Sequence, residues 1–198
     1  MLESLFELDK WLFGLVNGDW HNSFLDTIFP YWRDKKTWIP LYVLFAVLLG
    51  VKYQWKVFWV LLMVGIVILI ADQTSSELLK KSIERVRPCN DSSLPNVRIL
   101  VHCGGGFSFT SSHATNHFAL ATILYLSMRH FWTARWLPWA LYLWAFSIAY
   151  GQVYVGVHFP LDVFCGALLG MLIGWGVYGV FRRIDKRSNL SIFEVHEK

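Results

Sequence analysis

The chain has 198 residues, of which 55% are hydrophobic and only 16% carry a charge, with 18 Lys and Arg against 14 Asp and Glu. This composition and a mean hydropathy of +0.41 argue against a disordered chain and an ordinary soluble protein, and predict one integral-membrane domain over residues 1–198. The net charge of +4 does not indicate nucleic-acid binding, because the cations lie at the ends of apolar runs and form no basic stripe.

The first segment, residues 1–36, mixes apolar clusters with charged residues. Leu12, Phe13 and Phe29 are interrupted by Asp9 and other charges, which predicts an amphipathic helix lying in the membrane interface. A sixth, tilted membrane crossing in this segment is the alternative. The basic start and small-residue cleavage site of a signal peptide are missing.

Five apolar runs follow, and each is predicted to span the membrane. The clearest, 57–79, has 23 residues, enough at about 1.5 Å per residue to cross a hydrocarbon core of about 30 Å. The last run carries glycines at four-residue spacing, which allows close helix packing. The sequence therefore predicts an all-α, polytopic helical bundle. The runs are 38–55, 57–79, 112–128, 136–150 and 161–181, and the glycines are Gly166, Gly170 and Gly174.

The cations next to these runs predict the orientation. They fall on one side of a five-span arrangement, which the positive-inside rule assigns to the cytoplasm. Residues 182–198 are then a solvated cytoplasmic tail, and the opposite side holds 1–36, 80–111 and 151–160. The cations are Lys52, Lys56, Arg129, Arg135, Arg182, Arg183, Lys186 and Arg187.

Two of the cysteines, Cys89 and Cys103, lie in the long outer connection, whereas Cys165 lies inside an apolar run. An oxidising outer compartment would permit a Cys89–Cys103 disulfide that restrains this connection, and we predict one. Two reduced thiols are the alternative. A metal site built on these cysteines is not expected, because no CxxC pair exists.

The first of three polar clusters is the segment 80–88, where a helix leaves the membrane with Lys80, Lys81, Arg85 and Arg87 and ends before Pro88. Alone, this pattern is also typical of a basic helix end that meets lipid headgroups.

The second cluster is Thr110, Ser111, Ser112 and His113, at the start of an apolar run. Its hydroxyl groups are suited to capping a helix, and the free N–H groups of a helix N-terminus attract an anion. Plain capping is the structural alternative.

The third cluster contains His158, Pro160 and Asp162. Proline favours the first turn of a helix, so His158 is expected just outside the last span and Asp162 in its first turn. A carboxylate there accepts the Nδ1 proton of the imidazole and leaves Nε2 as a nucleophile or base. Interfacial polar groups without a catalytic role are the alternative.

Together the clusters predict a metal-independent phosphoryl-transfer site on the outer side. Lys80 and Arg87 would neutralise a phosphate, a helix N-terminus would bind it, His158 would attack and His113 would protonate the leaving oxygen. Ionisable groups near membrane depth are costly and tend to be functional.

The order and spacing of these residues resemble the type 2 phosphatidic acid phosphatase superfamily, whose pattern is K-x6-R-P, P-S-G-H and S-R-x5-H-x3-D. The residues that match are Lys80, Arg87, Pro88, Ser111, His113, His158 and Asp162. The resemblance implies a helical membrane fold, a phosphohistidine on His158 oriented by Asp162, and His113 as general acid. It also implies Lys80, Arg87 and Ser111 as phosphate ligands and no metal or other cofactor.

The chain departs from this pattern at Thr110, Ser112, Gly151 and Gln152. The first two changes are mild, because the Ser112 N–H group can still face the anion. Gln152 replaces an arginine, and a charge-assisted hydrogen bond is worth roughly 1.5 to 3 kcal/mol. Gln152 keeps hydrogen-bond donors and stays in the expected phosphate site.

Three explanations of the missing arginine stay open. Lys81, Arg85 or Arg98 compensates for it, the substrate carries a diphosphate or headgroup that needs another partner, or the protein is a weak or inactive member.

Other polar residues have structural interpretations. His117 lies four residues after His113, and we expect it to pack or to support the site rather than to bind a metal. Asp72 and Glu77 are expected to pair with Lys80, Lys81 or Arg85 because unpaired charge at that depth is costly, with proton relay as the alternative.

The sequence thus predicts a lipid phosphatase of a bacterial inner membrane with its site facing the periplasm or exterior. The candidate substrates, implied by the resemblance, are undecaprenyl pyrophosphate, phosphatidylglycerophosphate, phosphatidic acid and lipid A phosphates. The alternatives are an inactive lipid-phosphate binder or transporter, because of Gln152, and a transferase that passes the phosphate to an acceptor other than water.

Overall fold

The computed structural model describes residues 2–194, and the regular structure in this part of the chain is entirely helical, which confirms the all-α prediction. The α-helices are α1 (Leu2–Phe13), α2 (Ser23–Trp32), α3 (Ile39–Tyr53), α4 (Val57–Gln73), α5 (Lys80–Ile83), α6 (Ser112–Met128), α7 (Leu137–Tyr154) and α8 (Pro160–Ser188). Shorter π or 3₁₀ turns are η1 (Gly14–Asp19), η2 (Lys35–Trp38), η3 (Gln54–Lys56), η4 (Thr74–Leu79) and η5 (Pro88–Asn90).

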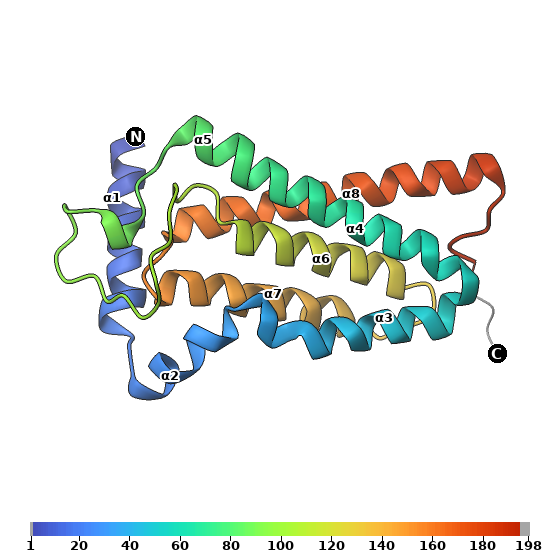
Figure 1. Ribbon diagram of the computed structural model, residues 1–198, viewed down its shortest axis with the longest axis horizontal. Coiled ribbons are helices and arrows are strands. Elements are labelled where there is room, and N and C mark those ends of the chain that lie inside the picture. The colour runs from blue at the N-terminus through green and yellow to red at the C-terminus, as the bar shows by residue number, and fades with distance from the viewer. Residues whose placement is uncertain (1, 195–198) are drawn as a thin grey trace.

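The long helices α3, α4, α6, α7 and α8 lie side by side along the long axis of the molecule, and α1 lies across one end of them (Figure 1). Two helical stretches, Lys35–Asn90 and Pro160–Ser188, are apolar and long enough to cross a membrane, and the first contains both α3 and α4. The number of crossings stays a prediction.

Helix α6 is the centre of the bundle and packs against α4, α7 and α8. The predicted close packing of the glycine stripe is confirmed, because a Cβ atom on Gly170 would lie 2.2 Å from the Thr115 carbonyl oxygen. Gly166 and Gly174 face α6 in the same way. This close approach holds the start of α6 beside the start of α8, where the motif residues lie.

The N-terminal segment consists of α1, η1 and α2 rather than a single amphipathic helix. Its apolar side chains pack on the region where α7 leads into α8: the Phe13 ring lies 5.5 Å from that of Phe159, and the Phe29 ring lies 4.8 Å from that of Tyr154. Asn17, which is 1% exposed, donates to the Tyr154 carbonyl at 2.8 Å. The segment therefore covers the loop that carries His158.

The connections fall into two groups at opposite ends of the bundle (Figure 1). The end that carries α1 also holds 84–111 and 155–159, which we call the site end. The opposite end holds 54–56 and 129–136, and we call it the far end.

The tail begins later than expected, because α8 continues to Ser188 and residues 182–188 are helical. Ile192 and Phe193 then fold back and are buried, with the Ile192 N–H donating to Asp185 at 2.7 Å. Residues 195–198 of the predicted tail lie outside the described part of the chain.

Candidate active site

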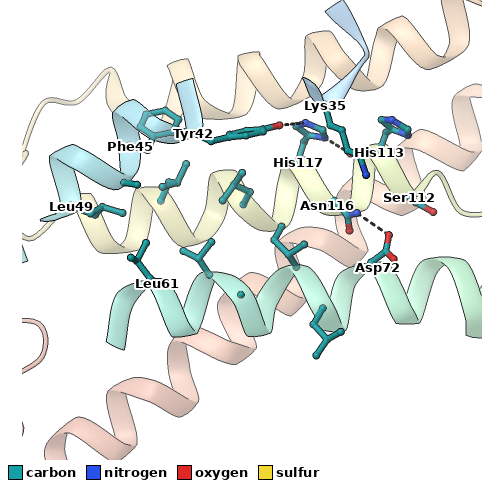
Figure 2. Close-up of a pocket in the computed structure, with 17 residues that line it drawn as sticks. Lys35, Tyr42, Phe45, Leu49, Leu61, Asp72, Ser112, His113, Asn116 and His117 are labelled. Carbon is teal, nitrogen blue, oxygen red and sulfur yellow. Dashed lines mark hydrogen bonds between the residues drawn. The ribbon is translucent and has the colours of Figure 1, made fainter. Parts of the chain in front are cut away.

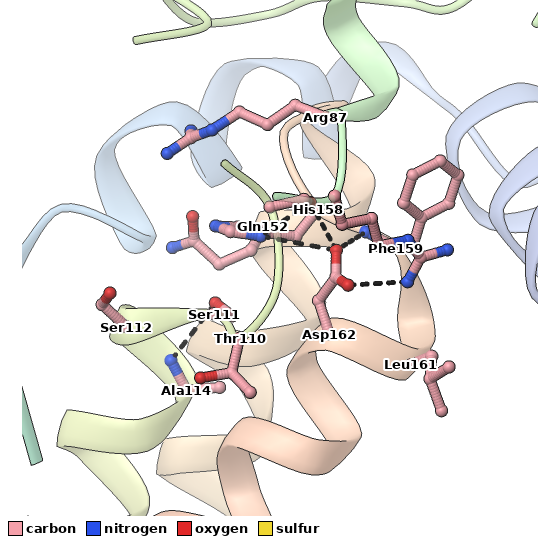
Figure 3. Close-up of polar contacts among 12 residues, drawn as sticks. Arg87, Thr110, Ser111, Ser112, Ala114, Gln152, His158, Phe159, Leu161 and Asp162 are labelled. Atoms are coloured by element: carbon pink, nitrogen blue, oxygen red, sulfur yellow. Dashed lines mark hydrogen bonds and ion pairs between the residues drawn. The ribbon is translucent and has the colours of Figure 1, made fainter. Parts of the chain in front are cut away.

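His158 lies in the short loop between α7 and α8 and is only 3% exposed. Its Nδ1 atom lies 3.6 Å from Asp162 Oδ2 and 3.3 Å from Ser108 Oγ, and Ser108 also donates to Asp162 Oδ2 at 2.5 Å. The sequence analysis predicted Asp162 as the partner of His158 Nδ1, but it did not predict Ser108. Because both partners are on the Nδ1 side, Nε2 is left for a ligand, as the arrangement in Figure 3 indicates.

Asp162 is held by contacts that only the folded chain can bring together. It is fully buried and accepts from the Phe159 N–H at 2.8 Å and from Arg85 Nη1 at 2.7 Å. Arg85 Nη2 donates to Asp9 at 2.5 Å, and Asp9 also accepts from the Leu161 N–H at 2.7 Å. The carboxylate therefore stays ionised and fixed beside His158.

Burial lowers the pKa of His158 to about 4, and the adjacent Asp162 only partly opposes this effect. The imidazole is therefore neutral near pH 7, which is the state that has a free lone pair on one ring nitrogen. The His158 N–H donates to the Gln152 carbonyl at 3.3 Å, so the loop itself is anchored to α7.

Arg87 approaches the same region from the outer loop and lies above His158 in Figure 3. Its guanidinium donates to the carbonyls of Cys103 at 2.8 Å and Gly106 at 3.2 Å. Cys89 and Cys103 are joined by a disulfide whose Cα atoms lie 6.0 Å apart. The disulfide thus joins Cys89, two residues after Arg87, to Cys103, whose carbonyl oxygen accepts a hydrogen bond from the Arg87 guanidinium.

The start of α6 is built as a cap, and its hydroxyl groups are mostly occupied. Ser111 Oγ accepts from the Ala114 N–H at 3.5 Å, and the Ser111 N–H donates to the Asp162 carbonyl at 3.1 Å. Ser112 Oγ instead lies 3.0 Å from Ser75 Oγ and 2.9 Å from Ser76 Oγ. What the helix start offers an anion at Ser112 is therefore the backbone N–H group rather than the hydroxyl.

His113 is supported by His117, as the sequence indicated. His117 Nδ1 lies 2.8 Å from the His113 carbonyl oxygen, and its Nε2 lies 3.0 Å from the Tyr42 hydroxyl. Both nitrogens of His117 are therefore engaged, with Nδ1–H as the donor to the carbonyl. No group of three or more His, Cys, Asp or Glu side chains able to hold a metal ion occurs within residues 2–194.

The residues expected to compensate for the missing arginine have other partners. Lys81 pairs with Glu77, Arg85 with Asp9 and Asp162, and Arg98 with Asp26 at 2.5 Å. The expected pairing of Glu77 is thus confirmed, and carboxylates already hold all three cations that could compensate for the missing arginine.

Arg33, which the sequence analysis did not select, contacts Gln152 instead. It follows α2 directly, and its Nε–H donates to Gln152 Oε1 at 3.0 Å. Gln152 is fully buried, and its Nε2 atom has no hydrogen-bond partner in the described part of the chain. Arg33 belongs to no sequence motif, so only the fold shows that it contacts Gln152, the residue that replaces the family arginine.

An apolar groove of about 710 Å³ leads to this site between α3, α4 and α6 (Figure 2). Leu49, Phe45 and Leu61 line its apolar part. Its polar end is lined by Lys35, Asp72, Ser112, His113, Asn116 and His117.

Asp72 in the groove was expected to pair with a cation, but within residues 2–194 it makes no ion pair and accepts from Asn116 Nδ2 at 3.1 Å instead. Asn116 Oδ1 is buried without a partner in residues 2–194. The polar end of the groove thus offers a carboxylate and an amide next to His113.

Comparisons with known proteins agree in pointing to one family. A family model described as the PAP2 superfamily matches residues 55–186. The lipid A 4'-phosphatase of Bacteroides thetaiotaomicron is 32% identical over 94% of this chain and 83% of its own length, and that of Porphyromonas gingivalis is 30% identical over 91% and 75%.

Solved structures give the same result. The crystal structure of Aquifex aeolicus LpxE is similar with a TM-score of 0.64 and 29% identity, over 85% of this chain and 93% of that one. A PAP2-type phosphatidylglycerolphosphate phosphatase from Bacillus subtilis has a TM-score of 0.70 and 25% identity, over 91% and 88%.

Proposed function

The chain belongs to the PAP2 superfamily of membrane lipid phosphatases, and we propose that it removes a phosphate from a lipid A-type glycolipid through a phosphohistidine on His158. The observation that carries the proposal is the buried His158–Asp162 pair, with Nδ1 occupied and the Arg87 side chain in the same region (Figure 3). A nucleophile oriented by a carboxylate, with a cation nearby, matches the needs of phosphoryl transfer.

In the first step Nε2 of His158 attacks phosphorus, the N–P bond forms and the bond from phosphorus to the sugar oxygen breaks. His113 gives its proton to the leaving oxygen. We propose that Lys80, Arg87, the Gln152 amide, the Ser111 hydroxyl and the Ser112 N–H group bind the phosphate, since the Ser111 N–H group already donates to the Asp162 carbonyl.

In the second step water attacks phosphorus and His113 accepts its proton. The N–P bond breaks and inorganic phosphate leaves. The chain's own cations compensate the phosphate charge, and we propose that no metal or other cofactor takes part. Phosphate release should therefore persist in excess EDTA, and its loss on chelation would contradict this part of the proposal.

The choice of substrate rests on the two lipid A 4'-phosphatases that match almost the whole chain. The groove supports it, because its apolar length suits acyl chains and Asp72 and Asn116 at its polar end can bind sugar hydroxyl groups (Figure 2).

The test is a panel of lipid substrates with purified protein, in which released inorganic phosphate is measured. Lipid A should be dephosphorylated faster than phosphatidylglycerophosphate, phosphatidic acid or undecaprenyl pyrophosphate. His158→Ala should lower release by about 10⁴-fold or more, because the nucleophile is lost. His102→Ala, which changes an exposed histidine of the same outer loop, is the matched control.

Other outcomes of this panel would replace the proposal. Lipid binding without release would establish a binder or transporter, and a phosphorylated lipid acceptor would establish a transferase. Faster release from a glycerol or isoprenoid lipid would exclude the glycolipid preference.

We further propose that the site end faces the periplasm or exterior of a bacterial inner membrane, since Lys52, Lys56, Arg129 and Arg135 lie at the far end. In a Cys165→Ser background, an impermeant thiol reagent should label Ser92→Cys in intact cells. Thr133→Cys should be labelled only after permeabilisation. The reverse pattern would invert the orientation.

A further inference from the structure

The departures at Gly151 and Gln152 coincide with the packing of α2 on α7. A Cβ atom on Gly151 would lie 3.0 Å from Phe29 Cδ1 and 3.6 Å from Arg33 Cβ. The first distance is tighter than an ordinary contact, so a larger residue at 151 would require the Phe29 ring at the end of α2 to shift. The glycine therefore permits the end of α2 to reach the position where the family pattern has its arginine.

Gln152 fixes the side chain of Arg33, the residue that directly follows α2. Arg33 donates through Nε to Gln152 Oε1 at 3.0 Å, and its two terminal nitrogens make no hydrogen bond within residues 2–194. Gln152 is fully buried, whereas Arg33 is only partly exposed. One edge of the guanidinium is thus anchored while the other remains available to a planar or tetrahedral oxyanion.

Arg33 belongs to a group of cations without carboxylate partners. Among residues 2–194, Arg33, Lys80 and Arg87 make no ion pair within 4.0 Å, although the neighbouring Arg85 makes two. Arg33 lies close enough to Arg87 and His113 to influence both electrostatically. Like charges gathered at a half-buried site repel one another unless an anion lies between them.

We propose that Arg33 is a phosphate-binding residue that replaces the missing family arginine from a different helix, and that Gln152 is its positioning residue. The Gln152 Nε2 group, buried without a partner, would donate to the same phosphate. This inference rests on the proposed function, since the anion is the phosphate that His158 attacks. It explains Gly151 and Gln152 as one change rather than as the loss of a ligand.

The first experiment measures phosphate release from the best lipid substrate. Arg33→Ala should lower kcat/KM by about 10- to 100-fold, as expected for one charge-assisted contact. The kcat/KM of Arg33→Lys should lie between those of the wild type and Arg33→Ala, because lysine keeps the charge but not the planar set of guanidinium donors. Lys36→Ala, which removes an exposed cation three residues away, should stay within twofold of the wild type.

Rescue separates a phosphate contact from a structural role. Millimolar guanidinium should restore part of the activity of Arg33→Ala but not of His158→Ala. The double variant Arg33→Ala with Gln152→Arg should exceed Arg33→Ala, because it returns a guanidinium to the family position. An Arg33→Ala protein that matches the wild type, or that neither guanidinium nor the second substitution improves, would overturn the proposal.

Vanadate binding gives an answer even if no lipid in the panel is hydrolysed. Orthovanadate should raise the thermal stability of the detergent-solubilised wild type and Lys36→Ala, and raise that of Arg33→Ala much less. Gln152→Leu should weaken vanadate binding with Arg33 still present. Equal vanadate affinities for wild type and Arg33→Ala would refute the role of Arg33, whereas failure of hydrolysis alone would refute only the proposed function.

Discussion

The two ends of the bundle are both rich in charge but use it differently. At the site end, Asp162 and Asp9 are 0% and 3% exposed, and Arg85 bridges them at 2.7 and 2.5 Å. At the far end, Lys56 donates to the carbonyls of Ser191 and Glu194 at 2.6 and 3.0 Å.

The other cations of the far end behave similarly. Lys52 lies 6.0 Å from the centre of the Phe131 ring, and Arg129 lies 5.7 Å from that of Tyr178. These charges interact with carbonyls and rings at a surface, which suits an anchor in the interface. A buried ion-pair network therefore distinguishes the site end from the far end, whose cations contact carbonyls and rings.

The largest effect is expected from Arg85→Leu. Removal of one member of a buried charge network costs about 3 to 5 kcal/mol, because Asp9 and Asp162 would lose their shared partner. The free energy of unfolding in detergent should fall by that amount, and phosphate release should fall with it as Asp162 loses its position.

Arg135→Leu is the matched change at the far end, where the arginine is exposed and makes no ion pair within residues 2–194. Its stability should stay within about 0.5 kcal/mol of the wild type. Similar losses for the two variants would remove the distinction between the ends.

A smaller effect is expected in the middle of the bundle, where α8 supports both ends. Gly170→Ala should lower the stability by about 1 to 3 kcal/mol, because a Cβ there would lie 2.2 Å from the Thr115 carbonyl oxygen. On the same helix, a Cβ at Gly176 would meet nothing within 4 Å, so Gly176→Ala is the control. Thermal unfolding of both variants checks this, and equal melting temperatures would show that α6 and α8 are not in close contact.

The smallest effect concerns the position of the nucleophile. Ser108→Ala removes the donor to Asp162 and should lower kcat by about tenfold, the lower end of the roughly 1.5 to 3 kcal/mol that a hydrogen bond to a charged group is worth. Ser108→Thr should retain most of the activity, and Ser82→Ala, which alters an exposed hydroxyl, should be neutral. An unchanged kcat in Ser108→Ala would show that Asp162 orients His158 unaided.

Local patterns were sufficient for part of this site. Pro160 before Asp162 predicted a carboxylate in the first turn of a helix, and the structure places it there, with its side chain accepting from the Phe159 N–H. Ser112 can offer an anion only its backbone N–H group, because its hydroxyl group makes hydrogen bonds with Ser75 and Ser76 across the bundle.

The sequence analysis did not predict contacts between residues that are far apart in the sequence. Asp9 and Arg85 are 76 positions apart, and Arg33 and Gln152 are 119 apart. No spacing rule relates such residues, and Asp9 and Arg33 look like ordinary surface charges until the chain is folded.

By itself, the sequence determined that the chain is a helical membrane protein with His113, His158 and Asp162 in a phosphatase pattern, because periodicity, capping and motif spacing are local properties. The tertiary structure decided which cations are neutralised and which remain free for an anion. Arg85 forms ion pairs with Asp9 and Asp162, whereas Arg33 donates through Nε to Gln152 and its terminal nitrogens make no hydrogen bond within residues 2–194. Charge pairing depends on distances in space, and only the packing of α1 and α2 against the loop of His158 sets those distances.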